Sequence, residues 1–269
     1  PQFLCGGGRI SRLAEGRKRA IIKKNETEGD RMHWTEESIA FLRDAANMSD
    51  YYRVIAEHIA PQLPENAHVC DAGCGIGLLS LALLPHCAAV TAVDADALAV
   101  RTMRESLPAR GIRVLCGDVE RLAPEEPYDA MVFCLFGRTE DALRIAKRQC
   151  RGRIFLVKRG YSHHRFSAGR VSLGEFTAGS TEEVLREKGI PYTLERFRAE
   201  FGQPLRSLAD AERFFALYNR SESEALTARE IKSRLIAGPS PEFPYYLPHK
   251  KALCLFTLDT LDLPEEENA

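Results

Sequence analysis

Hydrophobic residues follow two alternating patterns through the first half of the chain. Short runs that are almost continuously apolar, such as Ala130-Met-Val-Phe-Cys-Leu135, are typical of strands in a parallel sheet that is covered on both faces. Between these runs, apolar residues recur at helical spacing, as Tyr52, Ile55, Ile59 and Leu63 do. The alternation predicts strands at 67–71, 89–93, 112–116, 129–135 and 153–158, and helices at 35–46, 50–63, 77–84, 96–107 and 139–148. Repeated strand–helix units predict an α/β, doubly wound sheet, in which ligands bind beyond the carboxyl ends of the strands.

The second half of the chain is patterned differently. Ser180-Thr-Glu-Glu183 has the form of a capping box and predicts a short helix. An aromatic-rich strand is predicted from Tyr192 to about Phe201, and helices are predicted at 208–219 and from Thr227 to Gly238. A last strand is predicted from Ala252. The segment 202–251 is too long for a plain hairpin between the last two strands, so it is predicted to be an inserted helical cap.

The first 31 residues do not share this patterning. They contain a run of three glycines and then seven Lys or Arg residues between Arg9 and Lys24, with poor apolar periodicity. One interpretation is a basic arm for nucleic acid. The other is a flexible tail, or translated sequence upstream of a natural start at Met32. We expect the second, because the pattern of a globular protein begins with Met32-His33-Trp34.

Composition narrows the class of protein without changing the predicted fold. The net charge of -1 gives no global attraction to nucleic acid or to anionic membranes. No apolar run approaches the roughly 18 residues that a membrane-spanning helix needs, so we expect a soluble, cytoplasmic protein with no membrane partner. The eight cysteines are scattered and include no CxxC pair. They predict buried thiols in a reducing compartment, without a disulfide framework or a metal site.

A glycine-rich turn is the strongest chemical signal in the chain. Residues 69–83, VCDAGCGIGLLSLAL, run from an apolar strand into an apolar helix, with Gly73, Gly75 and Gly77 at alternate positions between them. Such a turn lets a ligand approach the backbone closely. The spacing differs from the GxGxxG of dinucleotide sites, and no lysine follows as in a phosphate-binding loop. Asp71 at the end of the strand would repel a pyrophosphate but would suit a cationic amino or sulfonium group. The turn therefore favours a zwitterionic nucleoside over NAD.

Asp71-Ala-Gly-Cys-Gly-Ile-Gly77 resembles the first signature motif of the class I (Rossmann-like) S-adenosylmethionine-dependent methyltransferases. Three further landmarks follow at the ends of the next predicted strands, and the resemblance covers about residues 50–160. It implies a set of residues that contact S-adenosyl-L-methionine and its product S-adenosyl-L-homocysteine: Tyr51, Asp71, Ala72, Gly73, Gly75, Gly77, Asp94, Ala95, Gly117, Asp118, Val119 and Cys134.

The resemblance assigns roles to several of these residues, and each has a simpler alternative. Asp94 would accept hydrogen bonds from both ribose hydroxyls, although it could merely cap the helix that begins near Asp96. Asp118 would receive the adenine amino group, with Val119 in apolar contact with the ring, although Asp118 could be a turn residue. Tyr51 lies on a helix that often covers the methionine end of the cofactor, but it could equally be a core aromatic.

The resemblance also implies a mostly parallel, seven-stranded sheet whose last strand, from Ala252, is reversed. We accordingly expect a Rossmann-like methyltransferase domain at 32–201 plus 252–263 and a helical cap at 202–251. The flanking segments would be a basic tail at 1–31 and an acidic tail at 264–269.

The resemblance implies methyl transfer, and the fourth strand bears on the acceptor. Adenine and glutamine N-methyltransferases carry an Asn/Asp-Pro-Pro-Tyr/Phe motif after it, whereas this chain reads Cys134-Leu-Phe-Gly137. A small-molecule or metabolite acceptor is therefore expected. Methylation of RNA or protein, a non-catalytic cofactor-binding partner subunit and a nicotinamide-dependent dehydrogenase are alternatives, of which the glycine spacing disfavours the last. The oligomeric state is not indicated.

A general base is needed only if the acceptor must lose a proton. The fourth strand is expected to lead to the opening of the methyl-transfer site, which we call the mouth. The candidate bases near it are Tyr161, His163, His164 and His249. His163 and His164 are adjacent and would point to opposite sides of an extended chain, so a shared metal is not expected. Aromatic residues of the cap either line a substrate pocket or form the cap's own core: Phe214, Phe215, Tyr218, Tyr245 and Tyr246.

Overall fold

The computed structural model describes residues 33–106, 111–222 and 224–265. The chain divides into two units, Pro1–His33 and Trp34–Ala269, and the fold described below is that of the second unit. The predicted basic tail at 1–31 lies outside the described residues, as do residues 266–269 of the predicted acidic tail.

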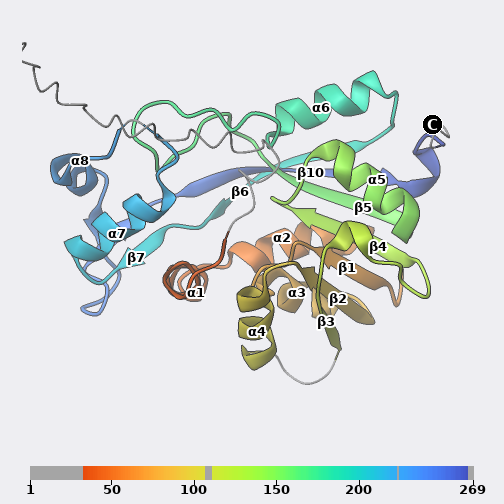
Figure 1. Cartoon of the computed structure of the whole chain (residues 1–269), viewed down its shortest axis with the longest axis horizontal. Helices are drawn as coiled ribbons and strands as arrows, with labels where there is room; N and C mark the ends of the chain where they lie inside the picture. The colour runs from red at the N-terminus through yellow and green to blue at the C-terminus, as the bar shows by residue number, and fades with distance from the viewer. Residues whose placement is uncertain (1–32, 107–110, 223, 266–269) are drawn as a thin grey trace, which may run out of the picture. The chain divides into compact units, whose positions relative to one another are not determined.

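A seven-stranded sheet is the centre of the fold (Figure 1). Its strands lie in the order β3 (Ile112–Cys116), β2 (Ala89–Asp94), β1 (His68–Ala72), β4 (Tyr128–Cys134), β5 (Cys150–Arg159), β10 (Lys250–Asp259) and β6 (Thr193–Glu200). The pairs from β3 through β5 are parallel, and β10 is antiparallel to both of its neighbours. This confirms the predicted doubly wound, mostly parallel sheet with a reversed last strand.

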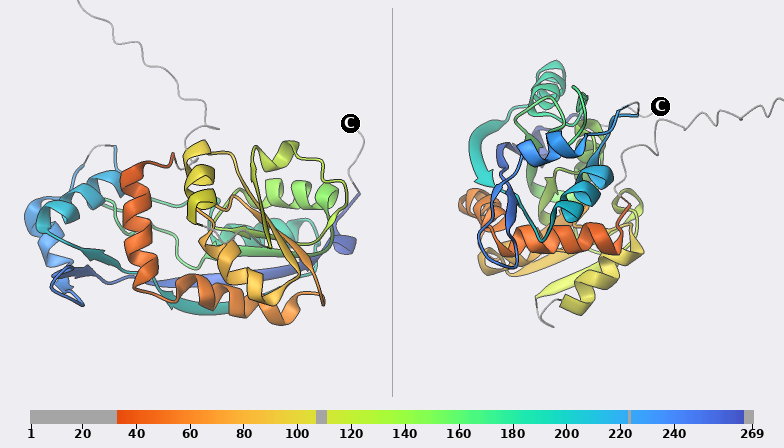
Figure 2. Two further views of the ribbon diagram at one scale, coloured as in Figure 1. Left: turned by 90° about the horizontal axis from the view of Figure 1, so that it is seen from below. Right: turned by 90° about the vertical axis from the view of Figure 1, so that its left-hand side faces the viewer.

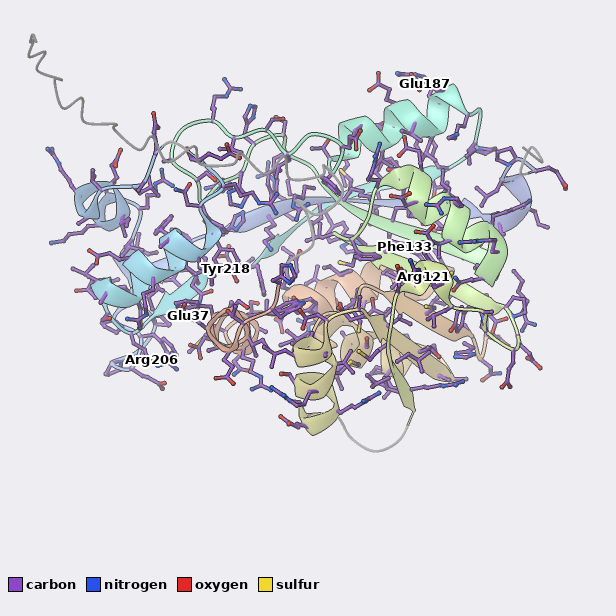
Figure 3. All side chains as sticks on the ribbon, viewed as in Figure 1. Glu37, Arg121, Phe133, Glu187, Arg206 and Tyr218 are labelled. Atoms are coloured by element: carbon purple, nitrogen blue, oxygen red, sulfur yellow. The ribbon has the colours of Figure 1, made fainter. Side chains whose placement is uncertain are left out.

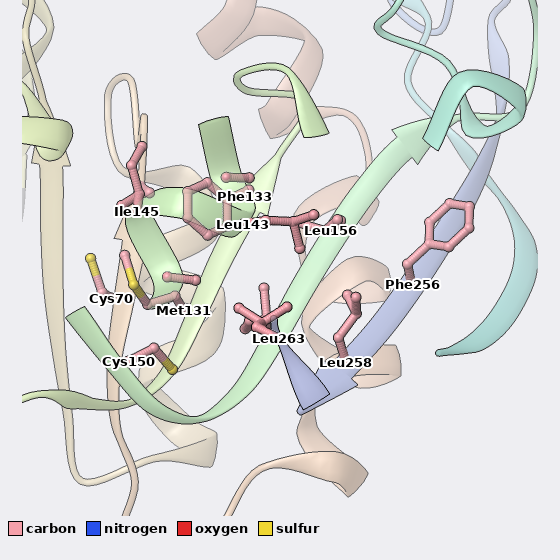
Figure 4. Packing of buried hydrophobic residues seen from close by; sticks show 14 of the residues in the cluster. Cys70, Met131, Phe133, Leu143, Ile145, Cys150, Leu156, Phe256, Leu258 and Leu263 are labelled. Atoms are coloured by element: carbon pink, nitrogen blue, oxygen red, sulfur yellow. The ribbon is translucent and has the colours of Figure 1, made fainter. Parts of the chain in front are cut away.

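Helices cover the sheet, and the alternation of side chains along the strands decides which helix meets which residue. Met131 and Leu156 belong to the core beneath α5 (Thr139–Gln149) and α6 (Ala178–Glu187), and this packing is seen close by in Figure 4. Their neighbours Val132 and Phe155 face the opposite way, toward α2 (Tyr51–Ile59) and α3 (Leu78–Leu83). Because both faces are buried in β1, in β4 and in the middle of β5, these strands read as nearly continuous apolar runs, whereas the edge strands β3 and β6 are partly exposed.

The ends of several helices differ from the sequence prediction. The helix predicted at 50–63 is α2 followed by the 3-10 turn Ala60–Gln62, because Pro61 cannot continue the backbone hydrogen bonds. The cap of α6 is Thr177, whose side chain accepts from the N–H of Ser180, so the capping box begins three residues before the predicted one. The remaining helices of this part are α1 (Glu36–Asn47) and α4 (Ala97–Ser106).

The segment 202–251 contains strands as well as helices. It holds α7 (Leu208–Tyr218), α8 (Ala228–Ser233) and a three-stranded antiparallel sheet in the order β7 (Gln203–Leu205), β9 (Tyr245–Leu247) and β8 (Ile236–Ala237). The prediction of a helix continuing to Gly238 is wrong. The N–H of Gly238 donates to the carbonyl of Pro244 at 3.0 Å, and that cross-strand bond closes the β8–β9 hairpin instead.

A small hydrophobic core, separate from those on the two faces of the sheet, joins α1 to the segment 202–251. Figure 2 shows α1 beside α7. The rings of Phe41 on α1 and Phe214 on α7 meet edge to face, with their centroids 5.4 Å apart. Phe214 and Phe215 are buried in this core, so they pack the segment itself. Tyr218 lies at the end of the same helix (Figure 3) and is only partly buried.

Candidate functional site

The glycine turn joins β1 to α3 at the carboxyl edge of the sheet. Gly73, Gly75 and Gly77 have φ values of +70°, +55° and +79°, which side chains of L-residues rarely allow. The N–H groups of Gly73 and Cys74 donate to the carbonyl of Val93 on β2, at 2.9 and 3.0 Å. The turn is therefore fixed against the neighbouring strand, and its three glycines are required by its backbone conformation.

Asp94 ties the turn to the end of β2. Its Oδ2 accepts the N–H of Gly75 at 2.7 Å, and its Oδ1 accepts the N–H of Asp96 at 2.9 Å. Burial raises the pKa of Asp94, while the two backbone hydrogen bonds act in the opposite direction. Asp96, not Asp94, caps α4, because Asp96 Oδ1 accepts the N–H groups of Leu98 and Ala99. One oxygen of the Asp94 carboxylate thus holds the turn and the other holds the backbone before α4, and Ala95 is exposed beside it.

Asp71 lies deeper than its position at the end of a strand suggests. Its side chain is 1% exposed, and its Oδ2 accepts a hydrogen bond from Ser80 Oγ on α3 at 2.6 Å. Burial raises the pKa of Asp71 to about 6, and the Ser80 hydrogen bond opposes part of that rise. The adjacent Ala72 is fully buried. In this structure Asp71 joins the strand to the helix that follows the turn.

Three large side chains cover the turn, and sequence reasoning missed all of them. A Cβ atom on Gly73 would lie 2.2 Å from the ring of Phe136, and one on Gly75 would lie 2.7 Å from the ring of Trp34. Met103 of α4 packs equally closely on Gly77. Phe136 lies two residues after the end of β4, which was a usable signal, whereas nothing local in the sequence connects Trp34 to the turn.

The end of β3 carries the residues expected near adenine. The N–H of Gly117 donates to the carbonyl of Asp94 at 2.9 Å, which holds β3 beside β2. Asp118 acts as a turn residue, since its Oδ1 accepts the N–H of Glu120 at 3.0 Å and caps the 3-10 turn Val119–Arg121. Val119 is buried in the core under α5. The structure thus brings these residues to the same edge as Asp94 and gives each a structural contact of its own.

The loop after β4 is held in an unusual conformation. Leu135 has a φ of +54°, which is strained for a branched side chain, and Gly137 has a φ of +65°. The amine of Lys158 on β5 is buried and donates to the carbonyl of Gly137 at 2.9 Å. Burial lowers the pKa of Lys158 to about 8. This loop carries Phe136 over the turn, next to Cys134.

Tyr51 and Cys134 lie together at this mouth. The Tyr51 side chain is 2% exposed, its ring lies 4.3 Å from that of Phe201, and its hydroxyl has no hydrogen-bond partner among the described residues. Burial raises the pKa of Cys134 to about 12, and the charge of Asp71 adds to the rise. Tyr218 of α7 contributes to the raised pKa of Tyr52, so the segment 202–251 reaches the same place. In this structure Tyr51 is therefore a core aromatic.

The four candidate bases do not form one group. His163 is hydrogen bonded to Ser162 and Arg170, whereas His164 is bonded to Ser167. The rings of Tyr161 and His249 lie 6.1 Å apart.

Two of these candidate bases, His164 and His249, have strongly lowered pKa values. Burial lowers the pKa of His164 to about 4 and that of His249 to about 3, so both are neutral at physiological pH. Among the described residues, no three His, Cys, Asp or Glu side chains are grouped so as to hold a metal.

Lys251 on β10 is a further residue that the sequence did not reveal. Its amine lies 4.4 Å from the centre of the Phe201 ring and 4.7 Å from that of Tyr51. Burial lowers the pKa of Lys251 to about 7, and the charge of Arg159 contributes. A cavity of about 510 Å³ is lined by Arg159, Tyr161 and Ala252, and Lys251 does not line it. It does not extend over the glycine turn, which Trp34 and Phe136 cover.

Residues 69–153 match the family model of a methyltransferase domain. The match begins in β1 and ends in β5, so it contains the turn, Asp94, Asp118 and Cys134. This part of the chain is therefore similar to a methyltransferase domain. A comparison with curated protein sequences found no significant match.

Several solved structures are similar to this chain in fold. One from Anaeromyxobacter dehalogenans, described as a candidate type II methyltransferase, has a TM-score of 0.51 at 17% identity, covering 80% of this chain and 98% of that chain. A candidate methyltransferase from Bacillus halodurans has a TM-score of 0.49 at 15% identity, with 77% and 98% covered. A candidate RNA methyltransferase from Pyrococcus horikoshii has a TM-score of 0.46 at 14% identity, with 77% and 82% covered. At these identities the likeness concerns the fold alone. In the part of the chain that the structure describes, no helix is long and apolar enough to cross a bilayer.

Proposed function

We propose that the protein is an S-adenosylmethionine-dependent methyltransferase that acts on a small molecule. The observation that carries the proposal is the position of Asp94 beside the glycine turn. A carboxylate has about four acceptor positions, and the N–H groups of Gly75 and Asp96 use two of those on Asp94. The others suit a pair of neighbouring hydroxyls such as those of a ribose. The cofactor supplies a methyl group that is already electrophilic because it is bonded to a sulfonium.

The residues around the turn fit the rest of such a ligand. Backbone groups of Gly73–Gly77 would meet its amino-acid end, and Gly117 and Asp118 would lie on its adenine side. Cys134 and Tyr51 would border the methyl group. The rings of Trp34 and Phe136 exclude bulk water from the turn, and holding a nucleophile in line in such a place is worth roughly 7–11 kcal/mol.

The loop and the segment that border the mouth favour a small acceptor molecule. The loop Leu135–Gly137 lacks the motif that holds planar amines, and Tyr218 of the segment 202–251 lies near enough to Tyr52 to contribute to its raised pKa. We propose accordingly that 32–201 plus 252–263 form the catalytic domain and that 202–251 is its substrate-side insertion. A cytoplasmic location also remains a prediction, consistent with the seven described cysteines being free thiols.

Calorimetric titration with S-adenosylhomocysteine, followed by transfer from labelled S-adenosylmethionine to fractionated cell extract, tests the proposal. We expect Asp94→Ala to lower the affinity for S-adenosylhomocysteine at least tenfold. Asp129→Ala is the matched control, because Asp129 also accepts a backbone N–H, that of His68 at 2.8 Å, but at the opposite edge of the sheet. Label is expected in the small-molecule fraction. Label in the RNA or protein fraction would refute the acceptor class, and cofactor binding without any transfer would indicate a non-catalytic subunit.

A further inference from the structure

The carboxyl end of β5 and the start of β10 bring several basic and polar residues together. Arg159 pairs with Leu253, and the N–H of Gly160 donates to the carbonyl of Ala252 at 2.9 Å. The residues that follow β5 therefore lie beside those that precede β10. This register explains why the ring of Tyr161 meets that of His249.

Positively charged side chains predominate where β5 ends and β10 begins. The charges of Lys251 and Arg165 both help to lower the pKa of His249, although burial is the larger cause. The charges of Arg159 and Arg220 act in the same way on His164. These cations come from β5, from β10 and from two separate loops, so the fold gathers them from segments that are distant in sequence.

Buried polar groups without partners lie among these cations. The His249 side chain is 2% exposed, and neither of its ring nitrogens has a hydrogen-bond partner among the described residues. The buried hydroxyl of Tyr51 also has no hydrogen-bond partner among the described residues. Buried polar groups are normally paired, so groups left unpaired in this way indicate a ligand that pairs with them. Lys251 lies above the Tyr51 ring, and its charge also acts on the pKa of His249, so both groups lie near its amine.

The carboxylate of Glu200, which bonds the backbone of His249, is engaged with other groups. Glu200 is exposed, and its Oε1 accepts both the Tyr246 hydroxyl at 2.7 Å and the backbone N–H of His249 at 3.1 Å. The charged group that contributes to the lowered pKa of Lys251 is another cation, Arg159. Like charges that are partly withdrawn from water are unfavourable together unless an anion compensates them.

We propose that Lys251, Arg159 and His249 bind the anionic group, a carboxylate or a phosphate, of the small molecule that the enzyme methylates. The inference rests on the proposed function, because it takes the mouth beside Cys134 as the acceptor site. A small molecule is favoured over the backbone of RNA because His249 and Tyr51 are almost fully buried and lie beyond the reach of a phosphate on a large polymer. The aromatic rings of Tyr51, Phe201 and Phe166 around the cations suit an apolar body next to the anion.

Titration with matched aromatic probes tests this site. Benzoate and phenyl phosphate carry the anion, and benzamide is the neutral counterpart of benzoate. We expect benzoate or phenyl phosphate to bind at least tenfold more tightly than benzamide, and the tighter of the two identifies the anionic group. Lys251→Met and Arg159→Gln are each expected to reduce that preference at least fivefold. Lys250→Met is the control, because Lys250 is the exposed neighbour on the same strand.

Each titration is made with and without S-adenosylhomocysteine, whose own binding is measured in every variant. Unchanged affinity for S-adenosylhomocysteine in Lys251→Met shows that the variant is folded. Equal binding of benzoate and benzamide, or an equal effect of Lys250→Met, would overturn the inference. Displacement of benzoate by a single-stranded RNA oligomer would overturn the small-molecule assignment. A preference for anions in a protein that fails to bind S-adenosylhomocysteine would support the anion site while refuting the proposed function.

Discussion

Replacing Gly73 by alanine tests the packing of the glycine turn directly. Gly73 has a φ of +70°, and placing an L-residue there costs about 1–2 kcal/mol. The new methyl group would also lie 2.2 Å from the Phe136 ring, far inside contact distance, and overpacking of this kind costs about 1–3 kcal/mol. The free energy of unfolding, measured with urea, should therefore fall by about 2–5 kcal/mol in Gly73→Ala.

The two causes can be separated with a second substitution. Phe136→Ala removes the ring, so in that background Gly73→Ala should destabilise by the backbone part alone, about 1–2 kcal/mol. The difference between the two backgrounds measures the contact between Phe136 and the turn. An equal loss in both backgrounds, or no loss at all, would refute the packing of Phe136 over Gly73.

Three other predictions follow from the same structure. Because burial raises the pKa of Asp71 to about 6 from an ordinary value of 3.8, its protonated form is favoured in the folded protein, and stability should fall by up to about 3 kcal/mol as the pH rises through this window. Asp71→Asn should remove that part of the slope in urea unfolding between pH 4 and pH 7, and an unchanged slope would contradict the burial of the carboxylate. Trp34 is the single tryptophan of the chain and lies on Gly75, so saturating S-adenosylhomocysteine should change its fluorescence, whereas an unchanged spectrum despite calorimetric binding would place the ligand elsewhere. A Cβ on Gly238 would lie 1.8 Å from the carbonyl oxygen of Phe243, so Gly238→Ala should reduce hydrogen-exchange protection in Tyr245–Leu247 and cost about 1–3 kcal/mol, and unchanged protection would argue against the tight β8–β9 hairpin.

The order of strands and helices could be predicted because each element has a recognisable hydrophobic pattern in its own stretch of sequence. Continuous apolar runs mark strands buried on both faces, and the turn at Gly73–Gly77 needs glycine for its own backbone. The strands of the segment 202–251 were missed because they are only two or three residues long. Strands this short leave no detectable alternation, and their pairing depends on the close backbone approach at Gly238.

The site was predictable only in part, for a related reason. Asp94 and Asp118 end strands of a parallel sheet, so their meeting at one edge follows from the fold. The covering of the turn by Trp34 depends on packing between distant segments. Lys250 and Lys251 look alike in the sequence, and only the strand register, which opposes Lys251 to Ala199, decides which of them faces the aromatic rings.

Calorimetric titration of the wild-type protein with S-adenosylhomocysteine, beside a titration with NADH, tests the central claim most directly. The claim is that the turn and Asp94 form the site of an S-adenosylmethionine-type cofactor. It predicts saturable binding of S-adenosylhomocysteine at one site per chain, weakened at least tenfold by Asp94→Ala, and no binding of NADH. Absence of S-adenosylhomocysteine binding, or unchanged affinity in Asp94→Ala, would contradict it.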